Sequence, residues 1–180
     1  MAHQEQVDFC LSVKDRYSDF FKNANVIDIG SLDINGNNRY LFENCNYTGV
    51  DIGAGKNVDV VSKGHEYIPS EKVDFVISTE CFEHDQYWDK TIQNIIENML
   101  KKGGMFLFTC ATTGRPEHGT RRADAGCSPF TAQTNGWEDY YQNLTEEDIR
   151  KAIDVDAYFK DYQFSVNPIS CDIYFWGIKK

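Results

Sequence analysis

Long apolar runs, paired cysteines and basic charge are all scarce in this sequence of 180 residues. The mean hydropathy is −0.52 and there is no run of 18 apolar residues, so we expect no transmembrane span. The first residues have no cationic start followed by an apolar stretch, so we expect no signal peptide. The balance of 18 Lys+Arg against 28 Asp+Glu gives a net charge of −10, which would repel a phosphate backbone. These absences predict neither a membrane partner nor a duplex nucleic-acid partner.

Six cysteines are present, but none forms a CxxC pair. Their scatter disfavours a cysteine zinc site and a disulfide framework, and it predicts free thiols in a cytoplasmic protein. No internal repeat, low-complexity tract or linker interrupts the chain. At this length about 70% of the unfolded surface is buried on folding, so residues 1–180 are expected to form one domain.

Short, nearly all-apolar runs alternate with helical periodicity. Residues 4–21 predict an amphipathic helix, and further helices are expected at 38–44, at 87–100 with a cap at 101–104, and from 145 to about 155. Strands that are apolar throughout indicate a parallel sheet covered on both faces. The last two strands are separated by only four residues, so they must be antiparallel. The prediction is a doubly wound α/β fold with strands at 25–30, 47–52, 58–61, 73–78, 105–110, 158–166 and 171–178.

An acid and glycines mark the turn after the first strand. Asp28 ends the strand, Gly30 permits close backbone approach, and Gly36 follows before the next element. Such a turn can hold the ammonium and carboxylate of a ligand, although it can also be a plain strand-to-helix turn. Asp51 ends the second strand 21 residues after Gly30, where a carboxylate can bind a ribose diol. Together these residues predict a ligand with an adenosine and a polar tail.

The same turn lacks the GxGxxG pattern of a dinucleotide site. Gly30 is followed by Ser31, Leu32 and Asp33, and the last of these would repel a pyrophosphate. The sulfonium and amino acid of S-adenosylmethionine tolerate nearby acids. This cofactor is therefore favoured over a nicotinamide dinucleotide.

With these motifs, residues 26–180 resemble the class I S-adenosylmethionine-dependent methyltransferases, in particular the small type 11 domains. The matching pieces are 26–36, 49–51, 74–84 and 100–104. The resemblance implies a Rossmann-like sheet of seven strands. It places Asp28, Gly30 and Ser31 around the methionine moiety, with Gly36 and Glu80 also at the cofactor. It further implies Asp51 on the ribose, Ile52 beside the adenine, and 59–64 near the adenine amine. Lys63 stands where many relatives have an acid, so Asp59 or a backbone carbonyl would replace it.

The residues after the fourth strand allow several roles. His84 and His118 are candidates for a general base, because an imidazole titrates near neutral pH. Glu80, Glu83, His84 and His118 could instead bind a divalent ion, as a similar Glu-x-x-Glu-His does in some ubiquinone-pathway and small-RNA methyltransferases. The favoured interpretation has no metal, with Glu83 and His84 capping and packing the start of the helix.

Residues 111–143 form a long stretch without periodicity, which is usually functional or mobile. Its arginines and aromatic residues would suit a lid over a planar or anionic acceptor. Alternatively, the arginines pair with Glu117, Asp124 or Glu138. The residues in question are Arg115, Arg121, Arg122, Phe130, Trp137, Tyr140 and Tyr141.

The sequence thus predicts methyl transfer from S-adenosylmethionine to a small-molecule acceptor. Two alternatives remain open: a non-catalytic nucleotide-binding module and a metal-assisted O-methyltransferase. A nicotinamide-dependent oxidoreductase is disfavoured by the missing glycine motif and by the terminal hairpin.

Overall fold

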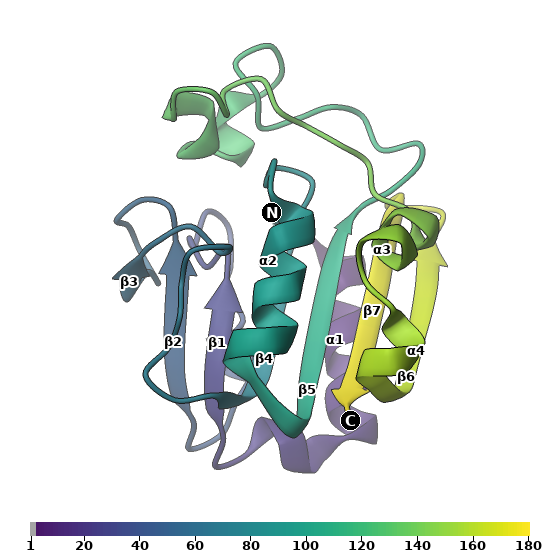
Figure 1. The fold of residues 1–180 in the computed structure, drawn as a ribbon. Coiled ribbons are helices and arrows are strands. Elements are labelled where there is room, and N and C mark those ends of the chain that lie inside the picture. Colours follow the sequence, from purple (N-terminus) through teal and green to yellow (C-terminus); the bar gives the residue numbers. More distant parts are fainter. Residues whose placement is uncertain (1–2) are drawn as a thin grey trace.

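A seven-stranded sheet with the order β3-β2-β1-β4-β5-β7-β6 organises the computed structural model, which describes residues 3–180 (Figure 1). Residues 1 and 2 of the predicted N-terminal segment 1–22 lie outside the described residues. The strands from β1 to β5 run parallel, and β7 is antiparallel to both β5 and β6. The predicted Rossmann-like fold with its terminal hairpin is therefore confirmed. The strand bounds are β1 Asn25–Ile29, β2 Asn46–Asp51, β3 Val60–Val61, β4 Val73–Thr79, β5 Leu100–Ala111, β6 Phe159–Asn167 and β7 Asp172–Lys179.

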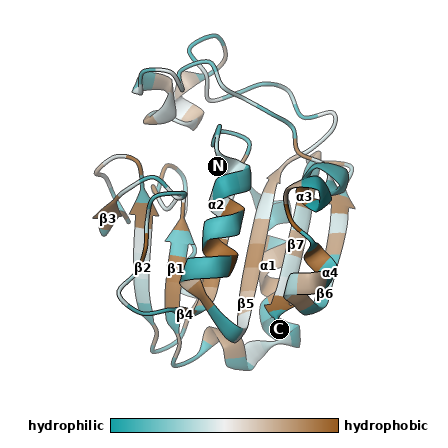
Figure 2. Cartoon of the chain, in the orientation of Figure 1, coloured by the Kyte–Doolittle hydropathy of each residue, from teal (hydrophilic) through white to brown (hydrophobic). Residues whose placement is uncertain are grey.

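Both faces of the central strands are buried because side chains alternate across a sheet that is covered on each side. One apolar cluster includes Ile92, Ile95 and Phe106 on the side of helix α2 (Trp88–Asn94). The other includes Cys10 and Val13 from helix α1 (Gln4–Arg16). Figure 1 shows α1 behind the sheet and α2 in front, and Figure 2 shows hydrophobic strands beneath a largely hydrophilic outer surface of α2.

The first helix is shorter than predicted. It ends at Arg16, and a separate 3-10 turn follows at Ser18–Phe21 because Tyr17 leaves the helical region of φ and ψ. Its buried residues are Gln6, Cys10 and Val13, whereas Leu11 is 38% exposed.

The predicted cap at 101–104 was also wrong. Helix α2 continues as a π-helical turn over Ile95–Met99, and Leu100 is already extended. The two lysines and two glycines that follow belong to β5, where Lys101 Nζ lies 2.8 Å from Asp74 Oδ1. Leu100 pairs with Val73 and Met105 with Phe75 of β4, so residues 101–104 lie in an irregularity between two paired positions of the strand.

Residues 38–44 form only a 3-10 turn, Arg39–Leu41, so the helix predicted there was wrong. The later helix does begin after Thr145, whose side chain accepts from the Asp148 amide in a capping box. It ends at Ala152 rather than near 155, and a short helix α4 (Val155–Tyr158) follows α3 (Glu146–Ala152).

The segment between β5 and α3 arches over the carboxyl ends of the parallel strands, shown in green at the top of Figure 1. It contains only two 3-10 turns, Ala125–Cys127 and Thr131–Gln133. Within residues 3–180, no helix is long and apolar enough to cross a membrane. The six cysteines are all free thiols, as predicted.

Candidate functional site

A cavity of about 210 Å³ lies at the carboxyl ends of β1, β2 and β4. Strand β1 sits between β2 and β4, so the chain leaves β1 and β4 in opposite directions, and ligands bind at such a switch point in open α/β sheets. Predicted site residues that line the cavity are Asp28, Gly30, Ser31, Gly36, Asp51, Ile52, Glu80 and His84.

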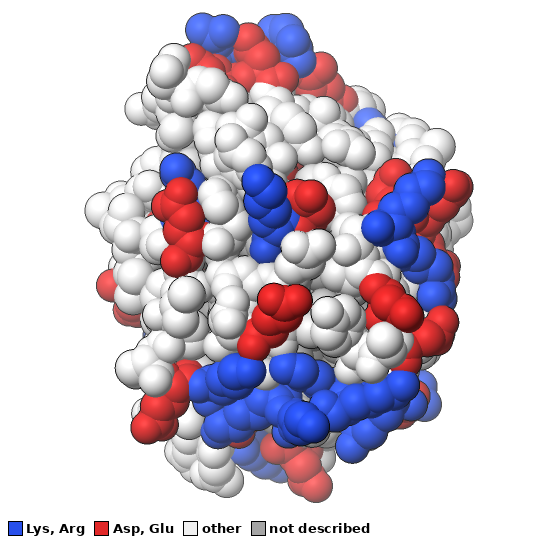
Figure 3. Space-filling model, viewed as in Figure 1, with Lys and Arg blue, Asp and Glu red and all other residues white. Residues whose placement is uncertain are grey.

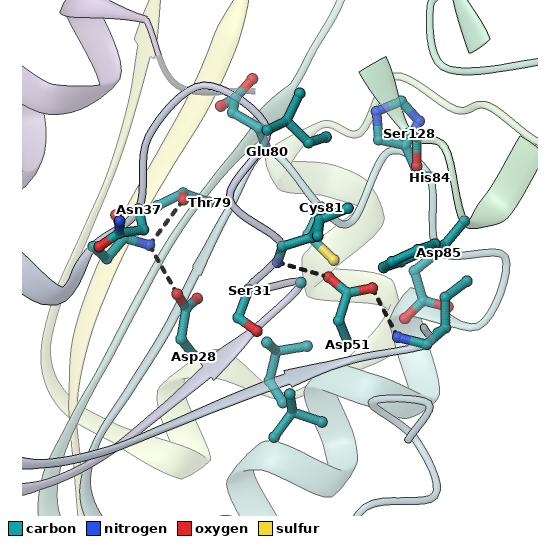
Figure 4. Close-up of a pocket in the computed structure, with 18 of the residues that line it drawn as sticks. Asp28, Ser31, Asn37, Asp51, Thr79, Glu80, Cys81, His84, Asp85 and Ser128 are labelled. Carbon is teal, nitrogen blue, oxygen red and sulfur yellow. Dashed lines mark hydrogen bonds between the residues drawn. The ribbon is translucent and has the colours of Figure 1, made fainter. Parts of the chain in front are cut away.

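The carboxylate of Asp51 is held at the end of β2 by backbone amides. Its Oδ2 accepts from Leu32 N at 2.9 Å and its Oδ1 from Ile52 N at 2.7 Å (Figure 4). Burial raises the pKa of Asp51, and these amide bonds oppose the rise. Each oxygen keeps a further lone pair, so the fixed carboxylate can accept from two hydroxyls of a ligand.

Asp28 lies deeper, at the end of β1. Its carboxyl group accepts from Tyr47 Oη and, at 3.4 Å, from Asn38 Nδ2. The other oxygen, Oδ1, has no hydrogen-bond partner within residues 3–180. Burial raises the pKa of Asp28 to about 7. Oδ1 of Asp28 is therefore available, beside the cavity, to accept a hydrogen bond from a ligand.

Gly30 is required by its surroundings. Its φ is +78°, and a Cβ at this position would lie 2.4 Å from the Sγ of Cys81. The absence of a side chain lets the turn after β1 press against the turn after β4. This contact places Asp28 and Glu80 on opposite sides of one small space.

Asp59 is not brought into the cavity. Its Oδ2 lies 2.5 Å from Arg39 Nη2 and accepts from Gly49 N at 2.7 Å, and its side chain is 47% exposed. Lys63 likewise pairs with Glu66 at 3.1 Å. Ser62 and Gly64 are the members of 59–64 that line the cavity.

Glu80 is tied to the N-terminal segment. Thr109 Oγ1 donates to Glu80 Oε1 at 2.8 Å, and His3 Nε2 lies 3.6 Å from Glu80 Oε2. Although burial alone would raise it, the contacts with His3 and Thr109 hold the pKa of Glu80 below its usual value. Hydrogen bonds with Asp172 and Glu80 raise the pKa of His3 to about 10. The protonated imidazole therefore neutralises Glu80, which lines the cavity.

Glu83, His84 and His118 form a second group beside the cavity. His84 and His118 stack edge to face with ring centroids 4.9 Å apart, and Glu83 Oε1 lies 4.0 Å from His84 Nε2. Burial raises the pKa of Glu83 to about 8 and lowers the pKa of His84 well below its usual value. His84 lines the cavity near Ser128 (Figure 4), whereas His118, which packs against His84, is not among the lining residues. The imidazole that reaches the cavity is therefore neutral at pH 7.

The arginines of the covering segment do not line the cavity. Arg121 pairs with Asp139 at 2.7 Å, Arg122 with Glu117 at 2.9 Å, and Arg115 with Asp172 at 3.4 Å. The aromatic part of the predicted lid does reach the cavity, through Phe130 and Trp137. Of the predicted acid partners only Glu117 is used, by Arg122, because Arg121 and Arg115 pair with acids that the prediction did not name. Of the predicted lid aromatics, Tyr140 and Tyr141 do not line the cavity.

Comparison with known families identifies the fold. A family model described as a methyltransferase domain matches residues 1–154. The chain belongs to this methyltransferase family. Its predicted identity as a class I S-adenosylmethionine-dependent methyltransferase is confirmed. No curated protein matches the sequence significantly.

Solved structures share the fold of the methyltransferase at low identity. The 1,6-didemethyltoxoflavin N1-methyltransferase of Burkholderia thailandensis, with 1,6-didemethyltoxoflavin and S-adenosylhomocysteine bound, has a TM-score of 0.64 at 13% identity. That likeness covers 97% of this chain and 78% of the other. The N-methyltransferase NodS of Bradyrhizobium japonicum, with S-adenosylhomocysteine, has a TM-score of 0.55 at 13% identity over 92% of this chain and 86% of the other.

Two parts of the methyltransferase site escaped the sequence analysis. Asp85 lines the cavity, and its carboxylate accepts from Thr91 Oγ1 at 2.5 Å and from Tyr87 N at 2.8 Å. An acid just before a predicted helix was the available signal for Asp85. His3 gave no local signal, because its partners Glu80 and Asp172 come from β4 and β7.

Proposed function

We propose that the cavity binds S-adenosylmethionine and that the methyltransferase moves the methyl group to a small-molecule acceptor. The observation that carries this proposal is the pair of carboxylates at adjacent strand ends, Asp28 and Asp51, with the side-chain-free turn at Gly30 between them. In this arrangement Asp51 binds the ribose hydroxyls and Ile52 flanks the adenine. Asp28, Gly30 and Ser31 hold the methionine part, and its ammonium donates to the free oxygen of Asp28.

The charge of the cavity supports a cationic cofactor. Asp28, Asp51, Glu80 and Asp85 all line it, whereas the arginines of the covering segment pair with acids elsewhere. S-adenosylmethionine carries a sulfonium and an ammonium, and both are stabilised near carboxylates. A pyrophosphate would be repelled by the same groups.

The reaction itself is a displacement at the methyl carbon. A lone pair of the acceptor attacks the carbon in line with the C–S bond, and the bonding pair stays on sulfur to give neutral S-adenosylhomocysteine. Because the sulfonium is already activated, alignment supplies much of the acceleration. His84 lines the cavity and His118 packs against it from the covering segment, so we place the acceptor beside His84.

A small acceptor fits the cover over this site. The cavity is closed by Phe130 and Trp137 from the arching segment and by Gln6 and Val7 from α1. Figure 3 shows Lys and Arg gathered at the opposite end of the molecule, below the amino ends of the parallel strands. These features support a small-molecule substrate rather than duplex nucleic acid. The free thiols are in keeping with a single-domain cytoplasmic enzyme.

Thermal unfolding with S-adenosylmethionine, S-adenosylhomocysteine or NAD tests the cofactor. At 100 times its dissociation constant, a ligand adds about 2.7 kcal/mol, which corresponds to a rise on the order of 5–10 °C at this size. We expect this shift with both adenosyl ligands and none with NAD. No shift with either adenosyl ligand overturns the proposal.

Methyl transfer is tested with methyl-labelled S-adenosylmethionine and a cell extract divided by mass. We expect label in the low-mass fraction. Label that enters only the macromolecular fraction contradicts a small acceptor. Binding of the cofactor without transfer to either fraction favours the non-catalytic module.

A further inference from the structure

Glu83, His84 and His118 place several ligand-type atoms together without partners. One atom from each residue can be chosen so that all three lie within 4.8 Å of one another. Glu83 and His84 come from the turn between β4 and α2, and His118 comes from the segment that covers the cavity. Glu83 is 0% exposed and His84 is 4% exposed. The group is therefore assembled by tertiary structure, with Glu83 and His84 buried and His118 half-buried.

The polar atoms of this group are not satisfied by the protein. Both carboxylate oxygens of Glu83, both ring nitrogens of His84 and Nε2 of His118 have no hydrogen-bond partner within residues 3–180. Each buried polar atom left in this state costs about 1–3 kcal/mol. So many such atoms at one point indicate a ligand that the chain itself does not supply.

The one ring nitrogen that is bonded has the orientation a metal ligand needs. His118 Nδ1 lies 3.0 Å from the carbonyl oxygen of Pro116, to which it donates. That hydrogen bond fixes the tautomer with the lone pair on Nε2, the atom that faces the group. Metal-binding histidines commonly donate their other nitrogen to a carbonyl in this way.

A second group of similar composition provides a contrast. His3, Glu80 and Asp172 also lie within 4.8 Å of one another. One atom of each of these residues also lacks a well-aligned hydrogen bond within residues 3–180. There, however, His3 Nε2 is 2.8 Å from Asp172 Oδ2, so a protonated imidazole neutralises the buried acids. In the first group the corresponding contact, from Glu83 Oε1 to His84 Nε2, is 4.0 Å long, which is too far for a hydrogen bond.

We propose that Glu83, His84 and His118 bind one divalent transition-metal ion. Two imidazoles and one carboxylate suit Zn²⁺ and its neighbours, and three protein ligands leave a position open for water or substrate. His84 borders the cavity, so the open position adjoins the acceptor end of the site. This outcome differs from the sequence-based preference for a packing role, because packing would leave these atoms unbonded.

The metal site also identifies the acceptor as an oxygen nucleophile, and this part rests on the proposed function. A hydroxyl bound at the open position loses its proton to solvent more readily, because the cation stabilises the resulting oxyanion. The oxyanion then attacks the methyl carbon, the C–S bond breaks, and its electron pair remains on sulfur. The products are the methyl ether and S-adenosylhomocysteine, with one proton released.

Cobalt provides a direct test of the metal site. The purified chain is stripped with EDTA, dialysed and titrated with Co²⁺, and visible absorption reports ligand number and stoichiometry. We expect one equivalent to bind, and at least a 100-fold loss of affinity in Glu83→Gln and in His118→Gln. His3→Gln is the matched control, because it alters the other group, and it should bind Co²⁺ as wild type does.

Stability separates loss of ligands from loss of folding. In EDTA, Glu83→Gln should unfold at the wild-type temperature or above, because it removes a buried acid that has no partner. Added Zn²⁺ should raise the unfolding temperature of the wild type but not of this variant. The metal site is overturned if the wild-type chain does not bind Co²⁺. It is also overturned if His3→Gln weakens Co²⁺ binding and Glu83→Gln does not.

The role of the metal in methyl transfer is tested with S-adenosylmethionine present. EDTA should abolish methyl transfer while the Kd for S-adenosylmethionine changes less than about twofold. If EDTA-treated protein still binds the cofactor and transfers methyl groups at the full rate, the metal has no role in activating an oxygen acceptor. Loss of S-adenosylmethionine binding in untreated protein would instead contradict the proposed function, so the two failures are distinguishable.

Discussion

Nε2 of His3 lies 2.8 Å from Oδ2 of Asp172, which joins the start of helix α1 to the first residue of β7. Asp172 is fully buried, and Arg115 Nη1 lies 3.4 Å from its other oxygen. The N-terminal segment is thereby attached to the strand next to β5, at the edge of the sheet where the cavity opens. The same imidazole also faces Glu80, so one protonated side chain neutralises two buried acids from different strands.

This contact predicts a specific dependence of stability on pH. The pKa of His3 is raised from 6.5 to about 10 in the folded chain by hydrogen bonds with Asp172 and Glu80. Because the folded pKa lies above the unfolded one, the contact stabilises fully below about pH 6.5 and is lost as pH rises toward 10. We expect His3→Gln to lower the free energy of unfolding by on the order of 1–2 kcal/mol at pH 6, after allowance for solvent screening. Urea unfolding of the wild type and of His3→Gln at pH 6, 8 and 10 measures this loss of stability. A difference between the two proteins that stays constant with pH contradicts the prediction.

Asp51→Ala should weaken S-adenosylmethionine binding at least tenfold, or about 1.4 kcal/mol, because it removes the carboxylate placed for the ribose. Isothermal titration calorimetry measures the change. Asp59→Asn is the matched control: its acid also follows the first strands, but it faces Arg39 outside the cavity. We expect its affinity to stay within about twofold of wild type. An equal loss of affinity in both variants would show that Asp59 also contacts the cofactor. No loss of affinity in either variant would show that Asp51 does not.

Gly30 and Gly103 have nearly the same φ, +78° and +76°, but different surroundings. A Cβ at Gly103 meets nothing within 4 Å, so Gly103→Ala should cost only the backbone strain of about 1–2 kcal/mol. Gly30→Ala adds a clash with Cys81 and should cost more. It should also weaken cofactor binding, which Gly103→Ala leaves unchanged. Denaturant unfolding together with calorimetry distinguishes the two variants, and equal costs would show that the clash relaxes.

Phe130 packs over the turn at Gly53, where a Cβ would lie 2.7 Å from its ring. Because this ring lines the cavity close to Ile52, Phe130→Ala should raise the Kd for S-adenosylmethionine about three- to tenfold, the loss of part of one buried aromatic contact. Arg121→Ala lies on the same covering segment but pairs outward with Asp139, and it should bind normally. Unchanged affinity in Phe130→Ala would restrict the covering segment to acceptor binding.

Local patterns were enough for the parts of the site that stand directly after a strand. Asp28, Gly30 and Asp51 line the cavity because parallel neighbours end at one edge, and this relationship can be read from the order of apolar runs. Asp59 instead lies immediately before the two-residue strand β3, and its side chain faces Arg39. Side-chain direction beside so short a strand depends on its neighbours in space, and composition does not report them.

The sequence by itself determined the class of sheet, the terminal hairpin and the acid–glycine–acid series of the cofactor edge, since strand burial, connection length and backbone freedom are local properties. Only the tertiary structure decided that residues 38–44 form no helix and that His3 contacts Glu80 and Asp172. It also decided that Glu83 and His84 meet His118 rather than Glu80. These outcomes depend on contacts between segments far apart in the chain, where burial and charge pairing outweigh local preference.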